Sequence, residues 1–356
     1  MPIPLETEEP HFREQNGYLT PHASASDFGS SKRAVRRSAL HHALLRSGIC
    51  QVRELAEWAR CKTVVMPKAS DLRAILATLD DRSEQRDAES DDESPIFLLA
   101  TGWRTGSTLL QRILVTDPRV LLWGEPFGEM ALLSALSEIL TRLSTFPNLK
   151  RHFAGTALVS SPETSKRMVK SWIATLYPTG DSLRASLRAL VDEWLKRPAV
   201  DRGFSRWGFK EVRLGATEAT LLRWLYPNAK FVTLARDPFD CYRSLADSGW
   251  HHIYFRRPDI RVDSAAGFAR HWNRLAVSWA ELPQEFPVFH LKYEDLVARK
   301  VNFRDLESWL GVQIKEEMAL AEEVGHTAAR GRLTWVERFI IRREAKQGMR
   351  ALGYSE

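Results

Sequence analysis

Cysteine is scarce in this chain, and long apolar runs are missing from it. Its three cysteines, Cys50, Cys61 and Cys241, are widely spaced and form no C-x-x-C pair. This odd, scattered set argues against a disulfide framework or a structural zinc site and favours a reducing compartment. No run of roughly eighteen apolar residues occurs, so we expect no transmembrane helix. Residues 1–30 also lack the apolar core of a signal peptide, and we therefore expect a cytoplasmic protein.

The balance of charge is basic but uneven. The 51 Lys and Arg residues exceed the 45 Asp and Glu residues, which gives a net charge of +6. Residues 80–94 hold eight acids and two arginines, so this stretch carries −6 and the remainder carries +12. A basic body suits an anionic ligand, and nucleic acid is one such ligand. The sequence has no zinc-finger spacing and no aromatic–basic repeat, so we expect no nucleic-acid partner.

The chain divides into four segments by composition. Residues 1–31 are polar with little periodicity and predict a loose arm, whereas residues 32–80 show helical spacing and predict a small helical extension. Residues 81–94 predict an acidic linker, because a stretch with almost no apolar residue buries too little surface to order itself. Residues 95–356 have the length and the alternating texture of one α/β domain.

Short apolar runs alternate with amphipathic segments throughout this last region. Runs of this kind are typical of parallel strands that helices cover on both faces. Strands are expected over 96–101, 120–123, 207–212, 231–235 and 288–291. Helices are expected over 106–116, 127–144, 181–196, 216–225, 238–247, 264–281, 302–310 and 333–350. Trp272 and Trp279, seven residues apart, are predicted to pack inward. In such a fold, ligands bind at the carboxyl ends of the strands.

The turn after the first expected strand is the most informative segment. Gly102 and Gly106 bracket it, Arg104 lies at its centre, and a hydroxyl pair, Ser107 and Thr108, opens the next helix. Backbone N–H groups at a helix N-terminus bind anionic oxygens without a metal ion. The usual nucleotide loop, G-x-x-x-x-G-K-[ST], has a lysine where Ser107 stands here. The turn therefore predicts a cradle for a phosphate-type donor other than Mg-ATP, and an ordinary strand-to-helix turn is the alternative.

A second motif follows the strand expected over 231–235. That strand ends at Arg236, Pro238 suits the first position of a helix, and Ser244 lies eight residues beyond the arginine. Eight residues are about two helical turns, so Ser244 returns to the face that looks toward the strand end. An arginine and a hydroxyl that converge there predict a clamp for a second phosphate. The alternative is a capped helix start with a surface arginine.

Together the two motifs resemble the sulfotransferases that use 3′-phosphoadenosine 5′-phosphosulfate (PAPS). In that family a [KR]-[ST]-G-[ST]-T loop binds the 5′-phosphosulfate, and Arg104–Thr108 matches it. An arginine at a strand end and a serine eight residues on bind the 3′-phosphate, as Arg236 and Ser244 would here. A later [RK]-Y-E-D-L element recurs as Lys292–Leu296. The resemblance covers residues 95–310.

This resemblance implies a P-loop-type three-layer fold with a central parallel sheet, PAPS as co-substrate and no required metal ion. It also implies a set of donor-binding residues, which are Gly102, Trp103, Arg104, Thr105, Gly106, Ser107, Thr108, Arg236 and Ser244.

Glu125 is the candidate general base. Tyrosylprotein sulfotransferases and several bacterial carbohydrate sulfotransferases resemble the chain here, because they combine an arginine in the loop with a glutamate base after the second strand. The alternative is that Glu125 caps the helix expected over 127–144. Glu129 is a further candidate, and His251 and His252 are rival bases, because histidine titrates near neutral pH.

Lys210 ends the third expected strand. In the family a lysine at a comparable place steadies the transferring group or orients the acceptor, so the resemblance implies a catalytic role. The proline that commonly follows is missing, and a surface lysine paired with Glu211 is the alternative. The R-K-G-x-x-G-x-W element of the cytosolic branch is also absent, which leaves Arg330 or Arg332 as a candidate contact of the 3′-phosphate.

The expected reaction is sulfuryl transfer from PAPS to an acceptor hydroxyl of a glycan, a lipid-glycan or a natural product. Arg256, Arg257 and Arg261 lie near aromatic residues and permit an anionic acceptor, and a peptide tyrosine stays open. Two alternatives remain at this point. One is a P-loop kinase or nucleotide hydrolase that needs Mg-ATP, and the other is a non-catalytic module that binds an adenosine bisphosphate.

Overall fold

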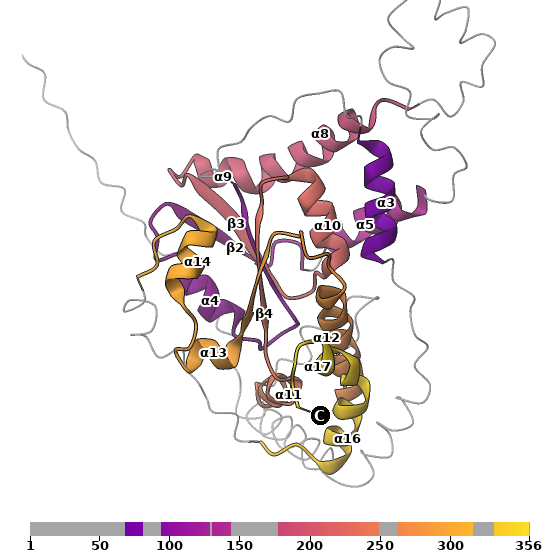
Figure 1. The fold of residues 1–356 in the computed structure, drawn as a ribbon, viewed down its shortest axis with the longest axis vertical. Helices are drawn as coiled ribbons and strands as arrows, with labels where there is room; N and C mark the ends of the chain where they lie inside the picture. The colour runs from indigo at the N-terminus through magenta and orange to yellow at the C-terminus, as the bar shows by residue number, and fades with distance from the viewer. Residues whose placement is uncertain are drawn as a thin grey trace, which may run out of the picture. The chain divides into compact units, whose positions relative to one another are not determined.

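A computed structural model of the chain gives the fold of the unit Glu54–Glu356 (Figure 1). It describes residues 68–80, 94–128, 130–143, 177–248, 262–315 and 331–355. The expected arm over 1–31, most of the extension over 32–80 and the acidic stretch up to Glu93 lie outside these residues.

The centre of the fold is a five-stranded sheet in the order β2-β3-β1-β4-β5 (Figure 1). Every neighbouring pair is parallel, so the expected α/β fold class is confirmed. The central strands are buried on both faces, which explains why they appear in the sequence as short, continuous apolar runs. The strands are β1 (Ile96–Ala100), β2 (Val120–Gly124), β3 (Arg206–Glu211), β4 (Lys230–Ala235) and β5 (Val288–Lys292).

Helices cover both faces of the sheet and form two cores. Because successive side chains of a strand point to opposite faces, Ile96 and Leu98 of β1 join one core, and Phe97 and Leu99 join the other. The first core also takes side chains from α4 (Ser107–Leu114), α11 (Pro238–Asp247), α12 (Ala265–Ala280), α13 (Tyr293–Val297), α14 (Phe303–Leu310), α16 (Trp335–Glu344) and α17 (Lys346–Ala351).

The second core is built against the opposite face of the sheet. Its helices are α3 (Ala69–Leu79), α5 (Leu132–Arg142), α8 (Gly180–Val191), the π-helix η4 (Asp192–Lys196), α9 (Arg197–Val200) and α10 (Ala216–Leu225). Helix α12 reaches both cores, because Trp272 lies in the first and Trp279 in the second. Both tryptophans are buried, as their spacing predicts.

Two helix predictions are wrong in their bounds. The helix expected over 127–144 begins only at Leu132. Phe127 is fully buried and its amide donates to Glu211 (3.1 Å). This hydrogen bond holds the residues before α5 in a turn. The helix expected over 333–350 is two helices, α16 and α17. The amide of Gly348 donates to the Asn273 side chain (2.7 Å) instead of to the helix, so the second helix packs closely on α12.

Helix α3 belongs to the body of the domain, although it precedes the residues where the α/β texture begins. Leu72, Ile75, Leu76 and Leu79 are buried in the second core, where α3 packs against α10 and α5. None of the described helices is both long enough and apolar enough to cross a membrane.

We predict that Leu72→Ala lowers the free energy of unfolding of the whole domain by about 2–5 kcal/mol, because it leaves a cavity in a fully buried position. Ser70→Ala, on the exposed side of the same helix, is the matched control. Chemical denaturation measures both variants. If Leu72→Ala left the main unfolding transition unchanged, α3 would be an independent appendage.

Candidate active site

The candidate site residues follow the carboxyl ends of neighbouring strands. Parallel pairing brings these ends to one edge of the sheet, in the order given by the strands (Figure 1). Glu125 follows β2, Lys210 lies near the end of β3, and the loop at 101–106 follows β1. Arg236 follows β4, and Tyr293 follows β5. Four polar or aromatic residues and the loop after β1 therefore lie at a single edge of the sheet.

The loop between β1 and α4 has a conformation that its glycines permit. Gly102 (φ 120°), Arg104 (φ 62°) and Gly106 (φ 87°) all adopt positive φ, which glycine tolerates best. A Cβ on Gly106 would lie 2.2 Å from the Tyr293 ring, so the close approach also requires glycine. Thr105 closes the turn by donating from Oγ1 to the carbonyl of Gly102 (3.1 Å).

The loop ends at a helix N-terminus that has no side-chain cap. Gly106 is the N-cap of α4, and no described side chain accepts a hydrogen bond from the first turn as a cap would. The first amides of a helix have no partner within the helix, so those at Ser107 and Thr108 suit an anion. Ser107 is buried and Thr108 is exposed. This geometry is compatible with the expected phosphate cradle, which stays a prediction.

Trp103 holds the loop from the side of α12. Its side chain is buried, and its ring lies 4.9 Å from the ring of His271. The Arg213 guanidinium lies 5.1 Å from the Trp103 centroid, a cation–π distance. Trp103 therefore connects the loop to α12 and to the segment after β3.

The two expected phosphate motifs meet at Arg104. Its Nε donates to Ser244 Oγ of α11 (3.0 Å), and its carbonyl accepts from Arg236 (3.0 Å). The Arg236 guanidinium stacks on the Tyr293 ring at 4.2 Å, and its Nε is buried with no hydrogen-bond partner in the described part of the chain. The predicted convergence of loop, arginine and serine is therefore present in the geometry.

The Lys292–Leu296 element supports this arrangement. Tyr293 packs against Gly106 and Arg236, as described above. Glu294 accepts from the amide of Asp237 (2.9 Å), and Asp237 caps α11 by accepting from the amides of Phe239 and Asp240. The capped helix start that the sequence allows is therefore present, and the phosphate clamp stays a prediction.

Glu125 lies in a compact cluster of charged side chains. Gly124 of β2 pairs with Lys210 of β3, which places Glu125 beside that lysine. Lys210 Nζ contacts one carboxylate oxygen of Glu125 (2.5 Å), and Arg213 contacts the other (2.8 Å). Arg213 also lies 3.4 Å from Glu211, which is fully buried. The cluster thus contains two carboxylates and two cations.

Both alternatives for Glu125 and Lys210 are wrong in this geometry. Glu125 does not cap a helix, because α5 begins seven residues later at Leu132. Lys210 is not a surface residue, because only 6% of it is exposed, and its ion pair is with Glu125 rather than Glu211. Arg213 is the partner of Glu125 that sequence reasoning missed, and its position just after the strand expected over 207–212 was the available signal. Glu211, inside that strand, was considered only as a partner of Lys210.

The pKa values of the two carboxyl groups shift in opposite directions. Burial by itself would raise the pKa of Glu125, but the charges and hydrogen bonds of Lys210 and Arg213 hold it below its usual range. Burial raises the pKa of Glu211 to about 7, and the nearby charge of Glu125 adds to that shift against the attraction of Arg213. Glu125 is therefore ionised at neutral pH, whereas Glu211 titrates there.

The structure does not describe several of the other candidates. Glu129, His251, His252 and Arg330 lie outside the described residues, as do Arg256, Arg257 and Arg261. Arg332 is exposed, and its neighbour Gly331 donates to Asp247 at the end of α11 (3.0 Å).

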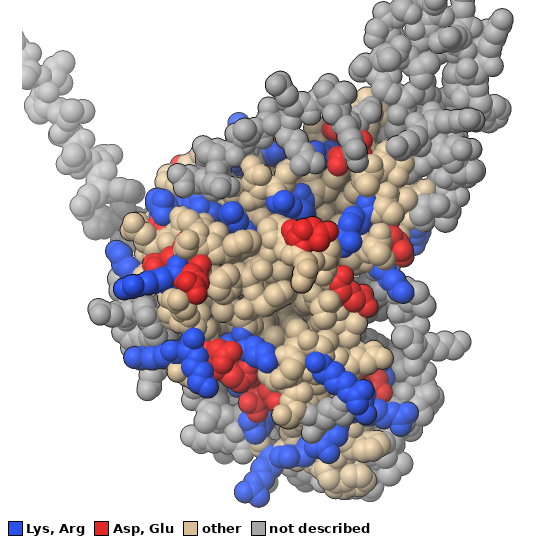
Figure 2. All heavy atoms as spheres, viewed as in Figure 1, with Lys and Arg blue, Asp and Glu red and all other residues tan. Residues whose placement is uncertain are grey.

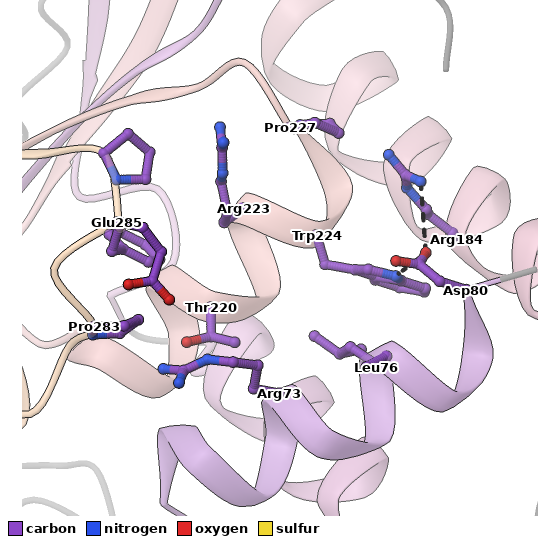
Figure 3. Close-up of a pocket in the computed structure, with 13 residues that line it drawn as sticks. Arg73, Leu76, Asp80, Arg184, Thr220, Arg223, Trp224, Pro227, Pro283 and Glu285 are labelled. Atoms are coloured by element: carbon purple, nitrogen blue, oxygen red, sulfur yellow. Dashed lines mark hydrogen bonds and ion pairs between the residues drawn. The ribbon is translucent and has the colours of Figure 1, made fainter. Parts of the chain in front are cut away.

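A hollow of about 310 Å³ lies at the opposite edge of the sheet (Figure 3). Trp224 and Pro227, which precede β4, and Pro283, which precedes β5, line it together with α3. Asp80 accepts from the Trp224 indole there (3.0 Å). Because these segments lead into the amino ends of strands, the hollow is separate from the candidate site.

The parallel sheet with a glycine-bracketed loop between β1 and α4 is the P-loop-type α/β arrangement. Within it, residues 95–316 match the model of the Sulfotransferase family. The match spans more than half of the 356 residues, so the chain belongs to the sulfotransferase family and is an enzyme of that family. This membership decides against the kinase or nucleotide hydrolase.

Solved structures of bacterial sulfotransferases are similar to this chain. The sulfotransferase domain from the olefin synthase of Synechococcus PCC 7002 is 20% identical, with a TM-score of 0.38 over 77% of this chain and 100% of that chain. The sulfotransferase from Alicyclobacillus acidocaldarius is 15% identical, with a TM-score of 0.37 over 74% of this chain and 97% of that chain. The sulfotransferase domain from the curacin biosynthetic pathway is 16% identical, with a TM-score of 0.36 over 74% of this chain and 98% of that chain. No curated protein matches the sequence.

We predict that Glu211 makes stability depend on pH. Its folded pKa of about 7 exceeds the ordinary 4.5, so the folded state holds an extra proton between these values and stability falls as pH rises through that window. The Phe127 and Val212 amides donate to different carboxylate oxygens of Glu211, so Glu211→Gln keeps an acceptor for one of them and removes the titration. As pH rises, the free energy of unfolding of the variant should increase relative to that of the parent, by roughly 3 kcal/mol at most.

Urea denaturation at several pH values between about 4 and 8 measures this difference. Parallel stability curves for the parent and Glu211→Gln would contradict the assignment.

Proposed function

We propose that this enzyme transfers the sulfuryl group of PAPS to the hydroxyl of a glycan, a lipid-glycan or a natural product. The contact of Arg104 with both Ser244 and Arg236 is the observation that carries the proposal, because it unites two anion-binding motifs in one site. PAPS has a phosphosulfate at its 5′ position and a phosphate at its 3′ position. Two adjacent anion sites therefore suit this donor.

The loop residues would hold the 5′ end of the donor. The uncapped amides at the start of α4 and the Arg104 guanidinium supply positive partial and full charge there. Arg236 and Ser244 would hold the 3′-phosphate, and the buried Arg236 Nε that lacks a partner among the described residues offers a donor for it. Ser107 replaces the lysine of Mg-ATP loops, and the proposal includes no metal ion.

Glu125 would act as the general base. The acceptor oxygen attacks sulfur, its proton passes to a Glu125 carboxylate oxygen, and the bond from sulfur to the bridging phosphate oxygen breaks. The products are the sulfated acceptor and adenosine 3′,5′-bisphosphate. Negative charge that develops on the departing phosphate is stabilised by Arg104 and the loop amides, which are already oriented before the reaction.

The ion pairs of Glu125 impose a condition on this step. Lys210 and Arg213 keep Glu125 ionised, which prepares it to accept a proton, but they also weaken it as a base. Lys210 lies between Glu125 and β1, because β3 pairs with both β2 and β1. We infer that Lys210 breaks its ion pair with Glu125 and binds the transferring sulfuryl group when the donor is bound. Loss of that ion pair would raise the basicity of the Glu125 carboxylate.

The type of acceptor and the cellular compartment belong to the proposal as well. The resemblance around Glu125 favours a hydroxyl on a glycan or a natural product, with a peptide tyrosine as the competing acceptor. Cytoplasmic location is supported by the scarcity of cysteine and by Cys241, which is a free, buried thiol.

Glu125→Gln should lower kcat by about 10²–10⁴, because it removes the proton acceptor. Its affinity for adenosine 3′,5′-bisphosphate should stay near that of the parent. Glu138→Gln, an exposed carboxylate of α5, is the control. Transfer from labelled PAPS to a panel of hydroxyl acceptors measures the rate. A fully active Glu125→Gln variant would remove Glu125 as the base.

Arg236→Ala should weaken binding of adenosine 3′,5′-bisphosphate by about 10- to 150-fold, because a charge-assisted contact with the 3′-phosphate is lost. Binding of adenosine 5′-monophosphate should change little. Calorimetric titration gives, for each nucleotide, the ratio of the dissociation constants of the variant and the parent. An equal loss for the two would mean that Arg236 supports the fold of the site and does not read the 3′-phosphate.

A further inference from the structure

Helix α16 presents two large aromatic side chains to solvent. Val336, Ile340 and Ile341 anchor the helix in the first core. On the opposite side Trp335 is 71% exposed and Phe339 is 50% exposed. They lie four residues apart and therefore share one face of the helix. Of the large apolar side chains in the described ranges, Trp335 has the highest exposed fraction.

Cations lie on the same face as these rings. Arg338 and Arg342 follow Trp335 by three and seven residues, so helical spacing places them beside the aromatic pair, and both are exposed. Residues 331–355 contain six Lys and Arg residues but only two acids. Glu337 is engaged in the N-terminal capping box, and Glu344 faces Arg270 (3.4 Å). Figure 2 shows Lys and Arg gathered over the α16 and α17 end of the molecule.

This surface is formed before any partner binds. Thr334 and Glu337 cap α16 reciprocally, and the buried side of the helix packs on α12 and α11. Helix α11 carries Ser244 of the candidate site, and Figure 1 shows α16 beside it. A partner that docks on α16 would therefore lie close to the carboxyl edge of the sheet, and it would not have to order the helix.

We propose that the α16 face, defined by Trp335, Arg338, Phe339 and Arg342, docks on the surface of a bilayer that contains anionic phospholipid. Interfacial helices combine aromatic rings, which enter the headgroup region, with arginines that bind lipid phosphates. The six Lys and Arg residues of 331–355 exceed the two acids there, so the charge of this surface complements the negative headgroups of such a bilayer.

Vesicle co-sedimentation of the full chain tests the proposal, without donor or acceptor, so its result does not depend on the proposed chemistry. The parent should bind vesicles of phosphatidylcholine with phosphatidylglycerol and should not bind phosphatidylcholine alone. Binding should weaken as salt is added, because exposed charges are screened. Trp335→Ser with Phe339→Ser should lower the partition coefficient at least about tenfold.

A charge variant and matched controls separate this face from general surface effects. Arg338→Gln with Arg342→Gln should weaken binding to the anionic vesicles about twenty-five-fold, which is roughly fivefold for each cation. Met130→Ser with Ile139→Ser changes two side chains of similar exposure, 56% and 57%, and should bind as the parent does. Circular dichroism verifies that each variant is folded.

Three results would overturn the proposal. The parent could ignore anionic vesicles, it could bind them without loss in either α16 variant, or it could bind soluble polyglutamate through α16 while ignoring vesicles. The last result would assign the face to an acidic protein partner.

Discussion

Parallel pairing of the five strands is the constraint on which the candidate site depends. It brings Glu125, the loop after β1 and Arg236 to one edge of the sheet, although these segments are widely separated in the chain. The loop itself is then fixed by long-range contacts. Tyr293 packs where only a glycine fits at position 106, and Arg104 reaches Ser244 of α11. The loop conformation is therefore a property of the assembled sheet.

Charge is arranged differently in the two halves of the site. Around Arg104 and Arg236 the site is cationic, as the proposed donor with its several negative charges would require. Around Glu125 two carboxylates and two cations lie together, and burial keeps Glu211 titrating near neutral pH. Arg213 connects the halves, because it contacts Glu125 and also lies over the Trp103 ring. Glu125 and the loop are thus held by one shared cation.

Elements outside residues 95–316 complete the domain. Helix α3 precedes the region that matches the family and fills the second core, while α16 and α17 follow that region and fill the first. A domain limited to the matched region would expose both cores. The outer face of α16 has the opposite character, with aromatic rings and arginines left in solvent beside the helix that carries Ser244. Core packing and the proposed membrane contact thus use opposite sides of one helix.

The sequence by itself determined the strands, most helix positions and the glycine-bracketed turn after β1, because apolar periodicity and turn residues act over short distances. The bounds of α10 and α11 agree with the expected ranges, whereas the helix expected at 127 starts at Leu132, because the Phe127 amide is drawn to Glu211. Only the tertiary structure decided the strand order. That order placed Lys210 and Arg213 on Glu125 and Tyr293 on Gly106, through contacts between residues that no local pattern relates.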